Sequence, residues 1–437
     1  MSKTQILLFF LLLSLMNLKP ISISIPLEKN PKNNFFTVPI SIGSPTGSQI
    51  FEVQVDTTTS ETWVPSINTT YKVSPKFNNS LSSSSNITNK TMEIFDEDGD
   101  VSGKATHDLI QIGNYSLENF GFVSIINYPS DFKDYPKGKL GLGYKQDHGD
   151  EFNFIKMLKE DNLIDNEIYT IDPQEEKLVI GNFTSEYSNY TYSFCNLTET
   201  HDLDDDYRAG WVCELTHAFF YEPLKYLEDG VETANARVIF DSAYQYIGIP
   251  RRNLDLFKKH YFEGVLNESC IEMRAKREIY FICENDEKLD NANITFVIGG
   301  FGYVLSKKEL FKPLYANKLE CVLRFVKQND NIFSFGVPFV NNYIMAYDAE
   351  NQQVGFIGGN KVDYYEDWKL WMKGISPKQR DYMKKLIIGA SALGGVLLLI
   401  VICLIIRACR KKNSSEIEHG PLMNNEQGAN MQNDLNY

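Results

Sequence analysis

Positive charge, histidine and cysteine are scarce in this sequence of 437 residues. The chain has 43 Lys and Arg against 57 Asp and Glu, for a formal net charge of -14 at pH 7. No basic stripe is available to neutralise phosphates, so we expect no nucleic-acid partner. The 6 histidines and 7 cysteines show no metal-ligand spacing, so the sequence predicts no metal site.

Motifs of several catalytic classes are also absent. The sequence has no Gly-x-Ser-x-Gly elbow of a serine hydrolase and no phosphate-binding Walker loop. Gly300-Phe301-Gly302 is an isolated fragment that fits a turn between strands better than a nucleotide site. We therefore predict no cofactor.

Apolar runs occur at both ends of the chain. Residues 6–16 follow Lys3 and have the length of a signal-peptide core, with small residues Ser22 and Ser24 as a cleavage point. We predict a signal peptide over residues 1–24 and a mature start near Ile25. Residues 386–406 carry no charge and are long enough to cross a bilayer as one helix.

These two runs together predict a single-pass membrane protein of the secretory pathway. With the N-terminus exported, residues 386–406 stop transfer, residues 361–385 form a luminal stalk, and residues 407–437 form a cytoplasmic tail. In the tail, Leu422 and Met423 follow Glu418 in a pattern similar to an acidic dileucine sorting signal. We expect the protein at the cell surface or in an endosome-like or lysosome-like compartment.

The region between the runs is rich in acceptor sites for N-linked glycans, which is typical of a luminal surface. Asn-x-Ser/Thr sequences begin at Asn68, Asn78, Asn86, Asn89, Asn114, Asn182, Asn189, Asn196, Asn267 and Asn293. We therefore expect N-linked glycans on this part of the chain.

Short apolar runs rich in Val, Ile, Phe and Tyr, separated by Gly, Asn and Asp, predict an all-β fold for this region. Few helices are expected, and two are predicted at residues 152–161 and 250–264, where apolar residues recur at intervals of three and four.

One pattern occurs twice, about 185 residues apart. A short apolar strand ends in Asp56 in the first copy and in Asp241 in the second, each followed by a hydroxyl residue and, further on, by an apolar segment with glycine. The first such segment is Lys139-Leu140-Gly141-Leu142-Gly143 and the second is Phe333-Ser334-Phe335-Gly336. A duplicated lobe explains the repeat and would place the two aspartates across a lobe interface.

These motifs resemble those of the pepsin family of aspartic proteases. Besides the two copies, the matching stretches are Gly43-Ser44-Pro45, Val55-Asp56-Thr57, Trp63-Val64-Pro65-Ser66 and Val354-Gly355-Phe356, in the family's order. The resemblance implies an all-β, bilobal fold with pseudo-twofold related lobes at residues 25–192 and 193–360. It also implies a central cleft for a peptide substrate, covered by a flap.

The resemblance implies that Asp56 and Asp241 form the catalytic dyad, with support from Thr57, Thr58, Ser60, Ser242 and Ala243. Two carboxylates that lie close together share one proton, because both cannot ionise at little cost. One can then activate a water as general base while the other polarises the peptide carbonyl.

Several positions depart from the family pattern. The family has glycine where this chain has Thr58 and Ala243, and these residues are expected to hold the carboxylates less well if the loops need a glycine conformation. The flap tyrosine of the family corresponds to Phe95 or Asp96, neither of which offers a phenol to Trp63.

The resemblance also implies disulfides. A bridge between Cys283 and Cys321 would enclose the strand pair that the family encloses, and a second would join Cys195 and Cys213, leaving Cys270 free.

Two hypotheses of function follow. The first is an aspartic endopeptidase that hydrolyses peptide bonds of proteins, because both aspartates are present. The alternative is a catalytically weak or inactive binding ectodomain on the same fold, because the loops around the aspartates are altered.

Overall fold

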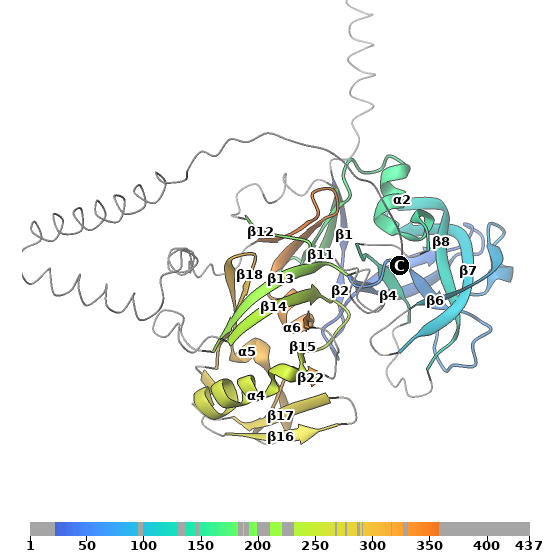
Figure 1. Cartoon of the computed structure of the whole chain (residues 1–437). Coiled ribbons are helices and arrows are strands. Elements are labelled where there is room, and N and C mark those ends of the chain that lie inside the picture. The colour runs from blue at the N-terminus through green and yellow to red at the C-terminus, as the bar shows by residue number, and fades with distance from the viewer. Residues whose placement is uncertain are drawn as a thin grey trace, which may run out of the picture. The chain divides into compact units, whose positions relative to one another are not determined.

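The computed structural model describes residues 22–94, 99–129, 137–144, 148–181, 187, 192–198, 210–220, 231–266, 269–275, 278–285, 289–290, 292–315, 317–326 and 331–357. Three β-sheets of 8, 11 and 6 strands make up most of this part of the chain (Figure 1). The all-β, bilobal fold predicted from the sequence is confirmed. The predicted stalk, membrane helix and tail lie outside the described residues, and no helix within those residues is long and apolar enough to cross a bilayer.

The first lobe is built on the 8-stranded sheet. Its strands, in spatial order, are β2 (Glu28–Lys29), β3 (Phe36–Ile42), β4 (Gln49–Asp56), β9 (Lys139–Gly141), β5 (Trp63–Pro65), β8 (Tyr115–Asn127), β7 (Val101–Ile112) and β6 (Asn86–Ile94). Alternating side chains of β3 are buried, as expected for a sheet with one face on the core.

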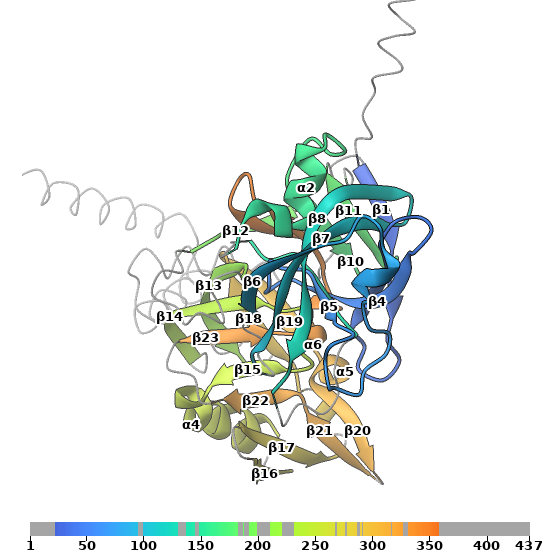
Figure 2. The ribbon, with the colours of Figure 1, turned by 90° about the vertical axis from the view of Figure 1, so that its right-hand side faces the viewer.

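The second lobe is built on the 11-stranded sheet. Its strands, in spatial order, are β19 (Phe301–Leu305), β18 (Ile294–Ile298), β13 (Val212–Phe219), β14 (Val231–Phe240), β23 (Ile332–Phe335), β15 (Ile247–Pro250), β22 (Leu323–Val326), β17 (Glu278–Glu284), β21 (Lys318–Cys321) and β20 (Phe311–Tyr315), with β16 (Cys270–Arg274) paired to β17. Figure 2 shows β16, β17, β20 and β21 together at one end of this lobe.

The 6-stranded sheet takes strands from both halves of the chain. In spatial order they are β1 (Ser22–Pro26), β11 (Lys177–Gly181), β10 (Ile168–Asp172), β24 (Ile344–Asp348), β25 (Gln353–Ile357) and β12 (Tyr192–Asn196). Every residue of β10 and of β24 is buried.

The repeat seen in the sequence is also a repeat of topology. In the first lobe β9 runs parallel to β4 and antiparallel to β5, and β5 runs parallel to β8. In the second lobe β23 runs parallel to β14 and antiparallel to β15, and β15 runs parallel to β22. In each lobe, therefore, the strand that ends at the aspartate is paired with the apolar segment that comes much later in the chain.

Helices are few and short in the described residues. The two predicted helical segments are confirmed as α2 (Phe154–Glu160), which is capped by the Asn153 side chain, and as a run formed by η4 (Arg251–Asn253), α4 (Leu254–Phe257) and η5 (Lys258–Val265). The remaining ones are η1 (Asn79–Leu81), η2 (Asp150–Phe152), α5 (Lys307–Leu310) and α6 (Val337–Val340).

One predicted disulfide is confirmed and the other is wrong. Cys195 is bonded to Cys213, but Cys283 is bonded to Cys270, and Cys321 is a buried free thiol. The reason is strand register. Cys270 lies directly opposite Cys283 in the β16–β17 hairpin, with the two Cα atoms 4.0 Å apart, whereas the β21 residue paired with Cys283 is Leu319.

Burial raises the pKa of Cys321 to about 12, so little reactive thiolate exists at neutral pH. We expect Cys321 to resist iodoacetamide in the native protein and to be labelled completely after unfolding without reductant. Peptide mapping by mass spectrometry checks both points. A peptide that joins Cys283 to Cys321 would contradict the pairing.

The predicted cleavage near Ile25 falls inside β1. Ile23 is fully buried and pairs with Ile180 of β11, so a cut at that point would remove Ser22, Ile23 and Ser24 from the sheet. The position of cleavage stays a prediction, and the strand leads us to expect a mature N-terminus at or before Ser22. N-terminal sequencing of the full chain from a secretory cell measures it. A start at Ile25 would show that the mature protein lacks the first three of the five residues of β1.

Candidate active site

Two aspartates lie at equivalent ends of the repeated strands. Asp56 is the last residue of β4, and Asp241 directly follows β14. Their exposed fractions are 0% and 2%. Burial of two carboxylates is costly unless hydrogen bonds or opposite charges compensate for the lost water, so the surroundings of each carboxylate decide its chemistry.

The two aspartate loops are joined by hydrogen bonds between their hydroxyl residues. The Thr57 hydroxyl donates to the carbonyl oxygen of Phe240 at 2.6 Å, and the Ser242 hydroxyl donates to that of Val55 at 2.7 Å. Each hydroxyl also accepts the backbone N–H of the other residue, at 3.1 and 3.2 Å. The structure thus brings both predicted residues to the junction of the two loops.

The residues that replace glycine still hold the carboxylates. Asp56 Oδ1 accepts hydrogen bonds from the Thr58 N–H at 2.8 Å, the Thr58 hydroxyl at 2.7 Å and the Thr59 N–H at 3.2 Å. The Ala243 N–H donates to Asp241 Oδ1 at 2.8 Å. Neither Thr58 nor Ala243 is among the described residues with positive φ, so neither loop needs a glycine conformation there. The condition under which looser binding of the carboxylates was expected is therefore not met, and the Thr58 hydroxyl adds a hydrogen bond that glycine could not make.

Strand β9 brings a lysine to the first aspartate. Lys139 is opposite Gln54 in the parallel pair with β4, and Gly141 is opposite Asp56. Because side chains alternate along a strand, Lys139 and Gly141 face the same side as Asp56, whereas Leu140 faces the core. Lys139 Nζ lies 2.7 Å from Asp56 Oδ2, and its side chain is 8% exposed.

This ion pair sets the protonation of Asp56. Burial by itself raises the pKa of the Asp56 carboxyl. The charge of Lys139, together with hydrogen bonds from Lys139 and Thr58, more than offsets burial, so the pKa lies below its ordinary value of 3.8. Asp56 is therefore a carboxylate across the physiological pH range, with one oxygen held by its own loop and the other by a cation.

These features, together with the family-model match, identify the fold family. The sequence model of the eukaryotic aspartyl protease family matches residues 35–358. The chain belongs to this family. Among curated proteins, it is 27% identical over 328 residues to Plasmepsin IV of Plasmodium falciparum, with 71% of this chain and 67% of that protein covered. It is 22% identical over 341 residues to a renin of Echis ocellatus, covering 72% of this chain and 78% of the renin. It is also 22% identical over 330 residues to Vacuolar protease A of Aspergillus fumigatus, covering 72% and 77%.

Two backbone bonds tie the segment after Lys139 to the Asp56 loop of this aspartyl protease homologue. The N–H of Leu142 donates to the Asp56 carbonyl at 2.8 Å, and the N–H of Gly143 donates to the Thr59 carbonyl at 2.7 Å. A Cβ on Gly141 would lie 2.5 to 2.6 Å from backbone atoms of the loop, so only glycine allows this approach. The position of Lys139 relative to Asp56 is therefore fixed by backbone contacts.

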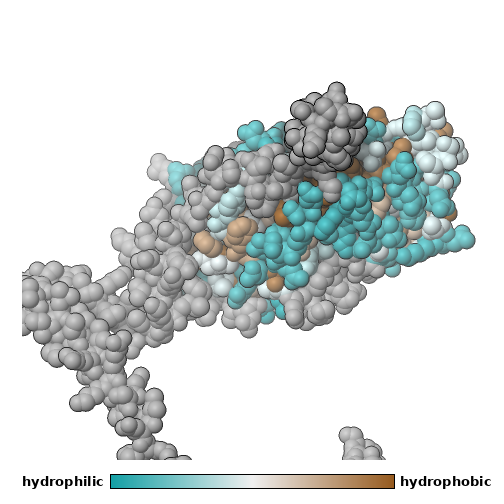
Figure 3. All heavy atoms as spheres, turned by 90° about the horizontal axis from the view of Figure 1, so that it is seen from above, coloured by the Kyte–Doolittle hydropathy of each residue, from teal (hydrophilic) through white to brown (hydrophobic). Residues whose placement is uncertain are grey.

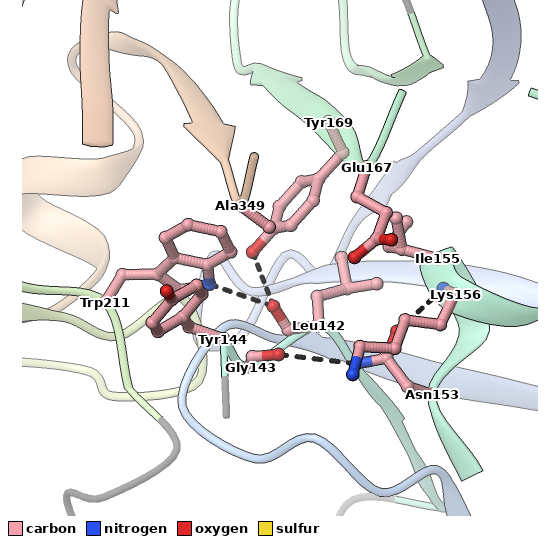
Figure 4. A pocket seen from close by; sticks show the side chains of 10 residues that line it. All are labelled: Leu142, Gly143, Tyr144, Asn153, Ile155, Lys156, Glu167, Tyr169, Trp211 and Ala349. Carbon is pink, nitrogen blue, oxygen red and sulfur yellow. Dashed lines mark hydrogen bonds between the residues drawn. The ribbon is translucent and has the colours of Figure 1, made fainter. Parts of the chain in front are cut away.

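A small recess lies behind this segment (Figure 4). The Leu142 carbonyl accepts hydrogen bonds from Trp211 Nε1 at 2.9 Å and from the Tyr169 hydroxyl at 2.7 Å. The recess is lined by Leu142, Gly143, Tyr144, Asn153, Ile155, Lys156, Glu167, Tyr169, Trp211 and Ala349. Its solvent-accessible volume is about 20 Å³, which is room for one or two water molecules rather than a substrate.

The other predicted site residues are less closely tied to the dyad. The Ser60 hydroxyl is buried and has no hydrogen-bond partner among the described residues, and the same is true of the Trp63 indole N–H. Trp63 packs with Met92 and Val101 of the β6–β7 hairpin. Phe95 and Asp96 lie outside the described residues. The described part of the chain has no group of three His, Cys, Asp or Glu residues that could hold a metal ion.

Sequence analysis overlooked Lys139, although a signal was present. The segment that begins at this residue is otherwise made of leucine and glycine, and a single charged residue in a strand that pairs with the one bearing Asp56 needs a partner. It also overlooked Thr59, whose N–H reaches Asp56.

The ion pair predicts a pH-dependent effect of substituting Lys139. Because the folded-state pKa of Asp56 is lowered, the pair stabilises the fold above the unfolded value of 3.8, and this stabilisation is lost as the pH falls through the lower folded value. Removal of one partner of a buried pair costs about 3 to 5 kcal/mol. We expect Lys139→Met to lower the Tm strongly at neutral pH and much less under acid conditions.

Lys137→Met is the matched control for this measurement. Lys137 is two residues away and pairs with Glu52 at 3.2 Å, but the two side chains are 48% and 54% exposed. Such surface pairs contribute about 0 to 1 kcal/mol. Thermal unfolding followed by circular dichroism should therefore separate the two variants, and equal Tm values at neutral pH would refute the buried ion pair.

Proposed function

We propose that this aspartyl protease homologue binds peptides between its lobes and does not hydrolyse them efficiently. The observation that carries the proposal is the contact of 2.7 Å between Lys139 Nζ and Asp56 Oδ2. Of the two sequence hypotheses, it favours the inactive binding ectodomain.

The reasoning follows from what an aspartate dyad must do. One carboxylate accepts a proton from water while the other donates a hydrogen bond to the substrate carbonyl, and a single shared proton allows both roles. The Lys139 ammonium places a full positive charge next to Asp56, so the Asp56 carboxylate is stabilised without sharing a proton with a second carboxylate. The same contact occupies Oδ2 and lowers the basicity of the carboxylate, which makes it a poorer general base.

A slow aspartic endopeptidase is the second candidate. It is supported by the presence of both aspartates and by the four hydrogen bonds that join their loops. In that case, substrate binding would have to move the Lys139 ammonium away from Asp56 before water could be activated.

We further propose that the protein acts in the secretory pathway as a type I membrane protein, with a luminal and N-glycosylated pepsin-like part. The support is the apolar run at residues 6–16, the uncharged run at residues 386–406 and the acceptor sites between them. One relative is named as a vacuolar protease, which is in keeping with a compartment of this pathway.

The test compares the full chain with its Lys139→Met variant, which has a side chain of similar length without the charge. We expect no hydrolysis of an unfolded protein substrate at acid pH by the wild type, and no retention on immobilised pepstatin, a ligand of working dyads. We expect the variant to gain both properties. A fluorescent unstructured peptide should bind to the wild type and remain intact.

Further variants separate the two candidates. Asp241→Asn, introduced into Lys139→Met, should abolish the gained hydrolysis, and Lys137→Met should behave as the wild type does. Hydrolysis by the wild type that disappears in Asp56→Asn would reject the binding proposal and establish the slow endopeptidase. A Lys139→Met variant that folds but stays inactive would show that Lys139 is not what silences the dyad.

A further inference from the structure

The strand at one end of the first-lobe sheet carries two glycan acceptor sites. Among the described strands, β6 pairs only with β7 and forms the last strand of the 8-stranded sheet. An edge strand offers unpaired N–H and C=O groups to any other edge that approaches, so natural proteins protect such strands. Asn86 and Asn89 both lie on β6, and both side chains are exposed.

The edge of β6 also exposes an apolar side chain between these two sites. Ile87 is 39% exposed. The pairing with β7 shifts register between Ile87 and Thr91, so Asn89 lies on an irregular stretch that interrupts the ladder. The Thr88 hydroxyl donates to the Ala105 carbonyl, and the Lys104 ammonium donates to the Thr91 hydroxyl and to the backbone carbonyl of Asn89, whereas the side chains of Asn86 and Asn89 are exposed. Both asparagines are therefore on the outer side of the hairpin.

The neighbouring loop repeats this association of acceptor sites with exposed apolar residues. Ile67 is 48% exposed and is followed by Asn68, and Leu81 is 56% exposed and bonds through its N–H to the carbonyl of Asn78. The Ile67 N–H donates to the carbonyl of Phe77, so the two segments lie side by side.

A fourth exposed apolar residue, Ile50, lies on β4 and is 67% exposed. The side chain of the preceding Gln49 makes two hydrogen bonds with the backbone of Asn78, at 2.8 and 3.0 Å, but consecutive side chains of a strand point to opposite faces, so Ile50 points away from this acceptor site. Three of the four most exposed large apolar side chains in the described residues of the first lobe therefore lie beside acceptor sites: Ile67, Leu81 and Ile87.

We infer that N-linked glycans on Asn86 and Asn89 shield the edge of β6, and that glycans on Asn68 and Asn78 shield Ile67 and Leu81. A glycan is bulky and strongly hydrated, so it blocks the approach of a second sheet edge and covers nearby apolar surface. Seen from above, the described surface is mostly hydrophilic or intermediate in hydropathy, with scattered apolar residues (Figure 3). Apolar residues that are exposed singly are normal on a protein surface and need no shielding. The open edge of a strand, in contrast, does need protection.

The inference rests on the luminal location proposed above, and one acceptor site serves as a control for it. Asn114 is exposed in the turn between β7 and β8, and Gly113 beside it has φ 57°. It lies in a turn that joins two interior strands of the 8-stranded sheet, and not on a strand at the end of that sheet. A glycan on Asn114 would report a luminal location without protecting an edge.

The experiment uses the full chain, expressed in a eukaryotic secretory cell and purified in detergent. Release of glycans in heavy-oxygen water converts each occupied asparagine into labelled aspartate, which peptide mass spectrometry locates. We expect label at Asn86 or Asn89, or at both. We also expect the double variant Asn86→Gln with Asn89→Gln to lose the mass of these glycans. After treatment with a chemical cross-linker, its main species should be an oligomer, whereas that of the wild type should be a monomer.

Matched variants decide the cause. Asn114→Gln should lose one glycan and stay monomeric, and Ile87→Lys added to the double variant should restore the monomer, because a charge on an edge strand also prevents pairing. Label at Asn114 with none at Asn86 or Asn89 would overturn the inference but leave the luminal location intact. Occupied sites whose removal leaves the monomer unchanged would overturn the shielding role. Neither result depends on peptide hydrolysis.

Discussion

The hydrogen bonds that Thr57 and Ser242 exchange are the interaction on which the rest of the structure depends. The two residues are 185 positions apart, and each hydroxyl donates to a carbonyl of the opposite strand while accepting the other residue's N–H. Both are buried, so water cannot compete for these bonds, and loss of one hydroxyl would leave several buried groups without a partner. The pair fixes the ends of β4 and β14 against each other and thereby places both aspartates in the interior.

Burying two carboxylates costs free energy because both lose their contacts with water, and this chain compensates one of them with a buried lysine. In the aspartate dyad of the family, a shared proton removes one of the two negative charges. Here the Lys139 ammonium, 2.7 Å away, compensates the charge of Asp56, which stays ionised. A pair that satisfies a buried carboxylate so fully stabilises the ground state of the site. In the binding function that we propose, the same pair makes Asp56 a poorer general base, which is a common trade between stability and activity.

The sequence predicted the parts of the fold that repeat and missed those that depend on register. The strands that end at Asp56 and Asp241 could be found because apolar strand, acid and hydroxyl residue recur in that order. The contact with Lys139 depends on which residue of a three-residue strand faces β4, and the bridge of Cys283 to Cys270 depends on which residues of a hairpin lie opposite each other. Chain order gives neither, because a shift of one residue reverses the faces of a strand.

The loop around Asp56 shows that the presence of both aspartates is weak evidence of catalytic activity. Asp56 Oδ1 accepts three hydrogen bonds from Thr58 and Thr59, two from backbone N–H groups and one from a hydroxyl. Replacing this carboxylate would leave these donors buried without an acceptor and would also remove the buried ion pair with Lys139, at a cost of several kcal/mol. Asp56 is therefore required by the architecture of its own loop whether or not it ever activates a water. Once Lys139 is in place, retention of the aspartate follows from folding alone, and the question of catalysis turns on the lysine beside it.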